Sequence, residues 1–163
     1  MKTLLILRHA KSSRDDPNMA DHDRPLNERG KRAAKEAGRF LRDEDLVPEL
    51  IISSTALRAR KTAQKAAKRC DYPRAIELSD RLYLSTPRDH LEVVQALADA
   101  EDCVLLVGHN PGISQFLSEL TDTASDLSTA ELGQVALPIN HWADLTGSDA
   151  GKLVKLWQPD KAD

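Results

Sequence analysis

The chain has 163 residues, of which 40% are hydrophobic and 30% are charged, so it is long enough to bury the core of one domain. Its net charge of -3 excludes a protein that binds polyanions over its whole surface, and any anion site must come from a local arrangement of residues. Cys70 and Cys103 are too far apart in sequence to predict a disulfide framework or a zinc site.

The sequence has no apolar segment long enough to cross a membrane, and the apolar run at residues 4–7 is too short for a signal peptide. We therefore expect a cytoplasmic protein that binds neither membranes nor nucleic acids. No repeat or linker divides the chain, so residues 1–163 are expected to form a single domain. The oligomeric state is left open.

The expected elements alternate between short apolar strands and helices with one apolar face. In chain order they are a strand at 3–7, a polar loop at 11–25, a helix after the N-cap Asn27 with its apolar face over 33–41, a strand at 50–52, an alanine-rich helix at 56–67, a weak strand at 75–78, a helix at 87–100, a strand at 104–107, a helix from 110, and strands at 135–139 and 153–157. This alternation predicts an α/β fold with a mostly parallel sheet and helices on both faces, and the final strand pair predicts an antiparallel edge.

Histidines and arginines follow three of these strands. Arg8 and His9 end the first strand, Arg58 lies in the first turn of the helix after the second, and His109 follows the strand at 104–107. Because ligands bind at the carboxyl ends of strands in open α/β sheets, we expect these four side chains to meet at one edge. A single histidine in such a place is commonly a hydrogen-bonded loop residue, so the prediction depends on all four converging.

Such a set fits the chemistry of a phosphoryl group. Two guanidinium groups can clamp its oxygens bidentately, and helix N-termini direct backbone N–H groups toward the same place. A histidine among cations tends to stay neutral, and a neutral imidazole is a competent nucleophile. This chemistry requires neither a metal nor a cofactor.

Three segments of the chain resemble the signatures of the histidine phosphatase superfamily, also called the phosphoglycerate mutase-like superfamily. The segment 7–10 (LRHA) is similar to its RHG signature, 53–63 to its S-S-x-x-x-R-A-x-x-T-A pattern, and 107–111 (VGHNP) to the segment around its second histidine. The segment 23–30 (DRPLNERG) is similar to the one before the family's first long helix. The resemblance spans nearly the whole chain, and among short members the SixA-type phosphohistidine phosphatases are the most similar.

This resemblance implies a three-layer phosphoglycerate mutase-like fold and a single histidine phosphatase domain over residues 1–163. It implies that His9 attacks phosphorus and carries the phosphoryl group, while Arg8, Arg58 and His109 hold its oxygens. Arg24 is expected to bind substrate at the mouth of the pocket. The implied partner is a phosphorylated protein, such as a phosphotransfer domain that bears phosphohistidine, or a small phosphorylated substrate; no metal and no cofactor are implied.

Two features depart from the family pattern. Ala10 stands where glycine is usual, which is tolerated if the backbone there does not need a positive φ. Larger members carry a Glu or Asp after the third strand that protonates the leaving group, and the corresponding segment here has no Glu in the expected place. Asp80, Asp21 and Asp23 remain candidates for the proton donor, as does the absence of any dedicated donor.

The missing acid favours a substrate with a good leaving group. A sugar or glycerate alkoxide needs a positioned acid, whereas the imidazole released from phosphohistidine is far less basic. We therefore expect a metal-independent phosphatase that works through a phosphohistidine intermediate and dephosphorylates protein phosphohistidine. The alternatives are a phosphomonoesterase acting on a sugar phosphate or nucleotide, and a phosphate-binding module without turnover. Whether the loop at 11–25 becomes ordered on binding is left open.

Other polar residues have simpler interpretations. Residues 53–55 are expected to cap the following helix rather than to act as nucleophiles. The acidic segment 21–23 is expected to be a solvated loop rather than a metal site. His90 is expected to be exposed on the polar face of its helix.

Overall fold

The computed structural model of the chain describes residues 1–160 and contains one six-stranded sheet in the order β3-β2-β4-β1-β5-β6. The strands are β1 (Lys2–Arg8), β2 (Leu50–Ser54), β3 (Glu77–Ser79), β4 (Cys103–Gly108), β5 (Leu132–Leu137) and β6 (Lys152–Trp157). The four strands from β3 to β1 are parallel, whereas β5 pairs antiparallel with both β1 and β6. The expected parallel sheet with an antiparallel edge is confirmed.

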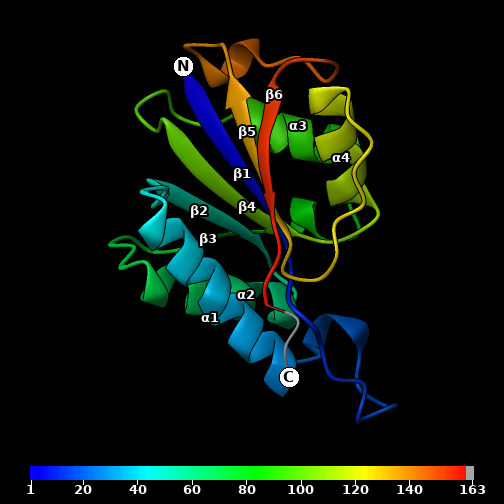
Figure 1. The fold of residues 1–163 in the computed structure, drawn as a ribbon. Helices are drawn as coiled ribbons and strands as arrows, with labels where there is room; N and C mark the ends of the chain where they lie inside the picture. Colours follow the sequence, from blue (N-terminus) through cyan, green and yellow to red (C-terminus); the bar gives the residue numbers. More distant parts are fainter. Residues whose placement is uncertain (161–163) are drawn as a thin grey trace.

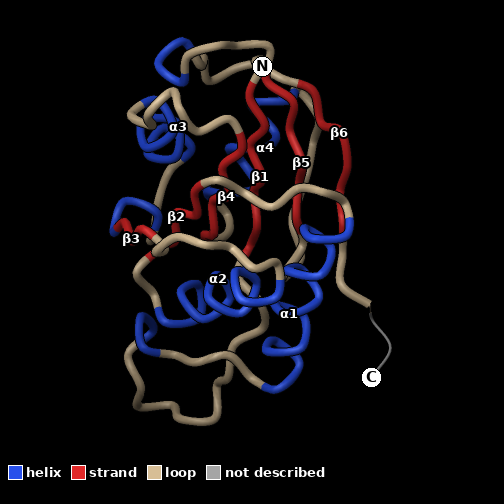
Figure 2. The backbone as a smooth tube through the Cα atoms, turned by 90° about the vertical axis from the view of Figure 1, so that its left-hand side faces the viewer, coloured by secondary structure: helices blue, strands red, loops and turns tan. Residues whose placement is uncertain are grey.

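Helices cover both faces of this sheet, which gives the expected three layers (Figure 1). The helices are α1 (Glu28–Asp43), α2 (Leu57–Arg69), α3 (Pro87–Gln95) and α4 (Gly112–Thr121). Figure 2 shows the chain from the side, with α1 and α2 together below the strands. Residues of α1 and α2 pack on one face of the sheet and residues of α3 and α4 on the other. None of the helices in residues 1–160 is long and apolar enough to span a membrane.

Alternation along β1 divides the core between the two faces, because successive side chains of a strand point to opposite sides. Leu5 and Leu7 pack with alanines and other apolar residues of α1 and α2, while Leu4 and Ile6 pack with residues of α3 and α4. All four leucine and isoleucine side chains are fully buried. Both faces of β1 are therefore covered, as an unbroken apolar run predicts.

Several expected boundaries are wrong. The helix expected at 87–100 ends at Gln95, where the N–H of Leu97 turns back to the carbonyl oxygen of Val94 (3.1 Å). In the segment beyond it, Nζ of buried Lys2 donates to the carbonyl oxygens of Asp99 (2.6 Å) and Glu101 (3.2 Å). The strand expected at 75–78 lies at Glu77–Ser79, and the strand expected at 135–139 begins earlier, at Leu132, where it pairs with β1.

The expectation that His90 is exposed is also wrong. Its side chain is only 1% exposed, its ring stacks on Phe116 of α4 with centroids 5.4 Å apart, and its Nδ1 lies 2.8 Å from the carbonyl oxygen of Thr86. The residues next to His90 in sequence are polar, which predicts an exposed face. The position of His90 itself on α3 nevertheless faces α4.

Candidate active site

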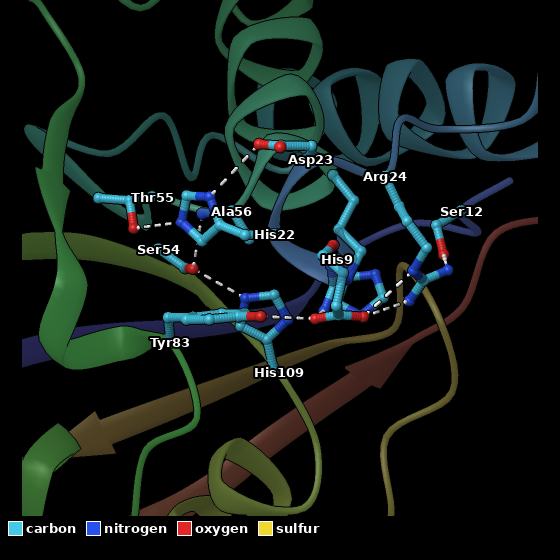
Figure 3. Close-up of polar contacts among 12 residues, drawn as sticks. His9, Ser12, His22, Asp23, Arg24, Ser54, Thr55, Ala56, Tyr83 and His109 are labelled. Carbon is cyan, nitrogen blue, oxygen red and sulfur yellow. Dashed lines mark hydrogen bonds and ion pairs between the residues drawn. The ribbon is translucent and has the colours of Figure 1, made fainter. Parts of the chain in front are cut away.

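Strand register brings the two histidines together. Strand β4 lies between β2 and β1, and Arg8 at the end of β1 pairs with Gly108 at the end of β4. The backbone N–H of His9 donates to the carbonyl oxygen of Gly108 at 3.0 Å, which continues this pairing by one residue. The rings of His9 and His109 therefore lie side by side, with centroids 5.0 Å apart (Figure 3).

His9 presents one free ring nitrogen. Its side chain is buried, and Nδ1 lies 2.7 Å from the carbonyl oxygen of Ala10, which can only accept a hydrogen bond. Nδ1 therefore carries the proton, and the lone pair of the neutral ring lies on Nε2. Burial, followed by the positive charges of Arg58, Arg8 and Arg24, lowers the pKa of His9 to about 4. At neutral pH the ring is therefore uncharged, and its Nε2 can act as a nucleophile.

The backbone after His9 is held by buried contacts. The N–H of Ala10 donates to Oγ1 of Thr62 at 2.9 Å, and that hydroxyl donates to the carbonyl oxygen of Arg58 at 2.7 Å. Ala10 is fully buried and is not among the residues with positive φ in the described chain, so the condition under which alanine is expected to be tolerated here is met. The segment that carries the nucleophile is thus tied to the first turn of α2.

A close approach of α1 supports the same segment from the other side. Asn27 caps the helix by accepting a hydrogen bond from the N–H of Gly30 at 2.8 Å, as the sequence predicts. A Cβ atom at Gly30 would lie 2.1 Å from the carbonyl oxygen of Lys11, so only glycine fits where α1 passes this backbone.

Arg8 and Arg58 each keep one buried donor unpaired. Nη1 of Arg8 donates to the carbonyl oxygen of Leu127 at 3.0 Å. Nη1 of Arg58 donates to the carbonyl oxygen of Asp21 at 2.7 Å, and Nη2 to its carboxylate at 3.0 Å. Within residues 1–160 the Nε atoms of both arginines are buried without a hydrogen-bond partner. Buried unpaired N–H groups are costly, and an oxyanion that accepted a hydrogen bond from them would remove this cost.

His109 is oriented by Ser54. Its Nε2 lies 2.8 Å from Oγ of Ser54, and that oxygen also accepts a hydrogen bond from the N–H of Ala56 at 3.1 Å. If the hydroxyl proton of buried Ser54 is directed at Nε2, both groups are satisfied and the ring keeps its proton on Nδ1. Nδ1 is buried and has no partner in the described chain. Burial, together with His9 and Arg58, lowers the pKa of His109 to about 3, so it offers this N–H as a neutral ring.

One pocket of about 320 Å³ contains all five residues expected at the site. Arg24 reaches it from the first loop, where Nη1 donates to Oγ of Ser12 at 2.6 Å and Nε to the carboxylate of Asp21 at 3.1 Å (Figure 3). The lining residues are Arg8, His9, Lys11, Ser12, Arg14, Arg24, Arg58, His109, Asn110 and Thr129. This set can hold a dianionic phosphoryl group against the free nitrogen of His9.

None of these lining residues, all within the described chain, carries a carboxyl group. Asp21 lies next to the pocket, but its carboxylate accepts hydrogen bonds from Tyr83 (2.6 Å), Arg58 and Arg24, which hold its pKa far below the usual range. A carboxylate held in its ionised form has no proton to give. Of the three candidate acids, Asp21 is therefore better suited to orient Arg58 and Arg24 than to protonate a leaving group.

The other two candidate acids make contacts outside the pocket. Asp80 accepts a hydrogen bond from the hydroxyl of Thr55 at 2.5 Å, and Thr55 also lies 2.9 Å from Nε2 of His22. Asp23 is exposed and lies 3.9 Å from Nδ1 of His22 (Figure 3). Within the described residues, no group of three or more His, Cys, Asp and Glu side chains is placed to hold a metal ion.

Sequence reasoning missed several residues around the site. The expectation that residues 53–55 cap the following helix is wrong, because the N-cap of α2 is Ala56 and has no side-chain cap hydrogen bond. Ser54 instead accepts the N–H of Ala56 just before the helix and contacts His109. Tyr83 packs edge-on against His109, with ring centroids 5.4 Å apart, and donates to Asp21. The roles of Ser54 and Thr62 could have been inferred only from their positions in the S-S-x-x-x-R-A-x-x-T-A pattern. Nothing in the sequence near Tyr83 indicates its partner.

Comparison with known proteins identifies the family of the chain. The model of the histidine phosphatase superfamily (branch 1) matches residues 4–83, which include Arg8, His9 and Arg58. An uncharacterized protein of Mycobacterium tuberculosis is 35% identical over 149 residues, which cover 85% of this chain and 91% of that protein.

Two solved structures resemble the whole chain. One, provisionally named as the phosphohistidine phosphatase SixA of Agrobacterium tumefaciens, has a TM-score of 0.80 and 27% identity, and covers 97% of this chain and 98% of its own. Another, named in the same way from Nakamurella multipartitia, has a TM-score of 0.83 and 26% identity, and covers 97% and 96%. The fold is therefore phosphoglycerate mutase-like, and the chain belongs to branch 1 of the histidine phosphatase superfamily.

Proposed function

We propose that the protein is a metal-independent phosphatase that transfers a phosphoryl group to His9 and then hydrolyses it, with protein phosphohistidine as its substrate. One observation carries this proposal: the neutral ring of His9 shares a pocket with buried, unpaired polar atoms of Arg8, Arg58 and His109. A nucleophile beside donors that lack a protein partner is the arrangement that phosphoryl transfer needs.

The reaction has two steps. Nε2 of His9 attacks phosphorus, the P–N bond of the substrate breaks, and the substrate imidazole leaves and takes a proton from solvent. Arg8, Arg58 and the Nδ1–H of His109 stabilise the charge on the three equatorial oxygens of the transferred group. A water molecule then attacks the phosphorus on His9, which releases inorganic phosphate and restores the neutral ring.

The choice of phosphohistidine rests on the leaving group. An alkoxide leaves with difficulty unless an acid protonates it, and no described residue that lines the pocket is a carboxylic acid. Imidazole is a much weaker base than an alkoxide and leaves without such help. The likeness to two structures named as SixA supports the same choice, with a phosphotransfer domain as the partner.

The test is to trap the intermediate and to compare substrates. Radiolabelled phosphoryl groups are expected to appear on the unaltered enzyme and on His22→Ala, a control histidine outside the pocket, but not on His9→Ala. The enzyme is expected to hydrolyse a phosphohistidine-bearing protein much faster than a panel of phosphate monoesters.

Other results of these two tests would favour a different function or a different nucleophile. Faster hydrolysis of monoesters would favour a phosphomonoesterase acting on small molecules. Binding of tungstate, an oxyanion that mimics phosphate, without turnover of either substrate would favour a phosphate-binding module. Label on His9→Ala would overturn the assignment of His9 as the nucleophile.

A further inference from the structure

A second groove opens beside the catalytic pocket and shares two of its lining residues, Lys11 and Thr129. It has a volume of about 180 Å³ and lies between the first half of α1 and the segment after β6, which runs alongside that helix (Figure 1). Its lining residues are Lys11, Arg29, Arg32, Ala33, Glu36, Ser128, Thr129, Gln158, Pro159 and Asp160. We call this cavity the α1 groove.

Positive charge dominates the surface that joins the pocket to the α1 groove. Lys11, Arg14 and Arg32 are exposed there, and none of them forms an ion pair with another residue of the described chain. Of the two carboxylates in the groove, that of Glu36 accepts a hydrogen bond from the backbone N–H of Asp160 at 2.9 Å. Since the whole chain has a net charge of -3, this excess of cations is a local property of the site.

We propose that the α1 groove binds an acidic segment of the partner protein, next to the residue whose phosphoryl group enters the catalytic pocket. This inference rests on the proposed function and names the kind of partner that fits it. Because Lys11 and Thr129 border both cavities, a chain that leaves the pocket passes directly into the groove. Exposed Lys and Arg side chains attract carboxylates and speed the encounter with an acidic surface.

The test uses the full chain and two phosphohistidine peptides that differ only in the flanking residues, which are Asp and Glu in one and Ser and Gln in the other. At low salt, kcat/KM for the acidic peptide is expected to exceed that for the neutral peptide by at least about threefold, as a few exposed charge pairs would give. The ratio is expected to fall toward one as added salt screens these charges.

Two charge reversals on α1 locate the effect. Arg32→Glu, inside the groove, is expected to remove the preference for the acidic peptide. Arg39→Glu makes the same change at an exposed residue two turns further along α1 and outside the groove, and it is expected to keep the preference.

The results separate this inference from the proposed function. If the unaltered enzyme hydrolyses both peptides at equal rates, or if Arg39→Glu loses the preference as fully as Arg32→Glu, the groove does not bind the acidic segment although the phosphatase assignment stands. If neither peptide is hydrolysed, the proposed function itself fails, and the role of the groove fails with it.

Discussion

The hydroxyl of Ser54 and Nε2 of His109 lie 2.8 Å apart, and this contact joins the end of β2 to the end of β4. The same oxygen accepts the N–H of Ala56 at 3.1 Å, so Ser54 connects the start of α2 to the second histidine. With the hydroxyl proton directed at Nε2, His109 can donate from Nδ1 without becoming charged. Ser54 is thus a positioning residue that acts through the tautomer of His109.

Replacing Ser54 by alanine tests this role. In Ser54→Ala the proton of His109 is free to move to Nε2, and kcat/KM is expected to fall by about tenfold to a hundredfold, less than the outright loss of an oxyanion donor. The drop should lie mainly in kcat, because the donor matters most in the transition state. Ser53→Ala is the matched control, since the hydroxyl of Ser53 bonds the backbone carbonyl of Ser54 and not His109. Equal rates for the two variants would contradict the tautomer role.

The dependence of activity on pH tests the state of His9. Its pKa is lowered to about 4, so the ring keeps its lone pair on Nε2 down to that pH and loses it by protonation below. We expect kcat/KM, corrected for ionisation of the substrate, to fall on the acid side with a midpoint near 4. Histidine without these neighbours would give a midpoint at about 6.5. A measured midpoint at that higher value would mean that burial and the three arginines do not act on His9.

Asp21→Asn distinguishes an orienting residue from a proton donor. The carboxylate accepts hydrogen bonds from Tyr83, Arg58 and Arg24, so its loss should displace both arginines and lower kcat/KM by about tenfold for every substrate. A proton donor would instead matter more for alkyl phosphates, which release a poor leaving group, than for p-nitrophenyl phosphate, which releases a good one. A much larger loss on the alkyl phosphates would show that Asp21 is the acid.

Gly30→Ala tests the contact between α1 and the segment after His9. The added Cβ would meet the backbone carbonyl of Lys11 at 2.1 Å, and backbone moves less readily than a side chain. The free energy of unfolding is expected to fall by about 1–3 kcal/mol, with a loss of activity as Lys11 shifts. Gly147→Ala is the control, because its new Cβ would meet one atom of the flexible Leu91 side chain at 3.2 Å. Similar unfolding curves for the two variants would show that α1 can move away without cost.

The sequence predicted the parts of the site that depend on position along a strand. Arg8, His9 and His109 follow apolar runs, and the carboxyl ends of parallel strands meet at one edge whatever the rest of the fold does. The roles of Ser54 and Tyr83 could not be predicted, because each depends on a partner distant in sequence. The error at His90 has the same origin, since its burial comes from the packing of α3 on α4.

The expected end of α3 was wrong for a related reason, because it too depends on contacts between residues distant in sequence. The residues after Gln95 have a helical apolar pattern, but the N–H of Leu97 bonds the carbonyl oxygen of Val94 at 3.1 Å, which is a tighter turn than an α-helix makes. Beyond this turn, buried Lys2 donates to the carbonyl oxygens of Asp99 and Glu101. Lys2 lies far from these acceptors in sequence, so no local pattern near Gln95 predicts where α3 ends.

The placement of the two histidines directly after β1 and β4 couples the chemistry of the site to folding. These neighbouring strands form the middle of the sheet, and the apolar residues 4–7 in β1 and 104–107 in β4 are fully buried. Because central strands of this kind separate only when the whole domain opens, we expect their amides to exchange with solvent through global unfolding. A partly opened molecule would release Arg24 or Asp21 with the first loop and still keep His9 beside His109. Loss of the histidine pair therefore reports the loss of the native state itself.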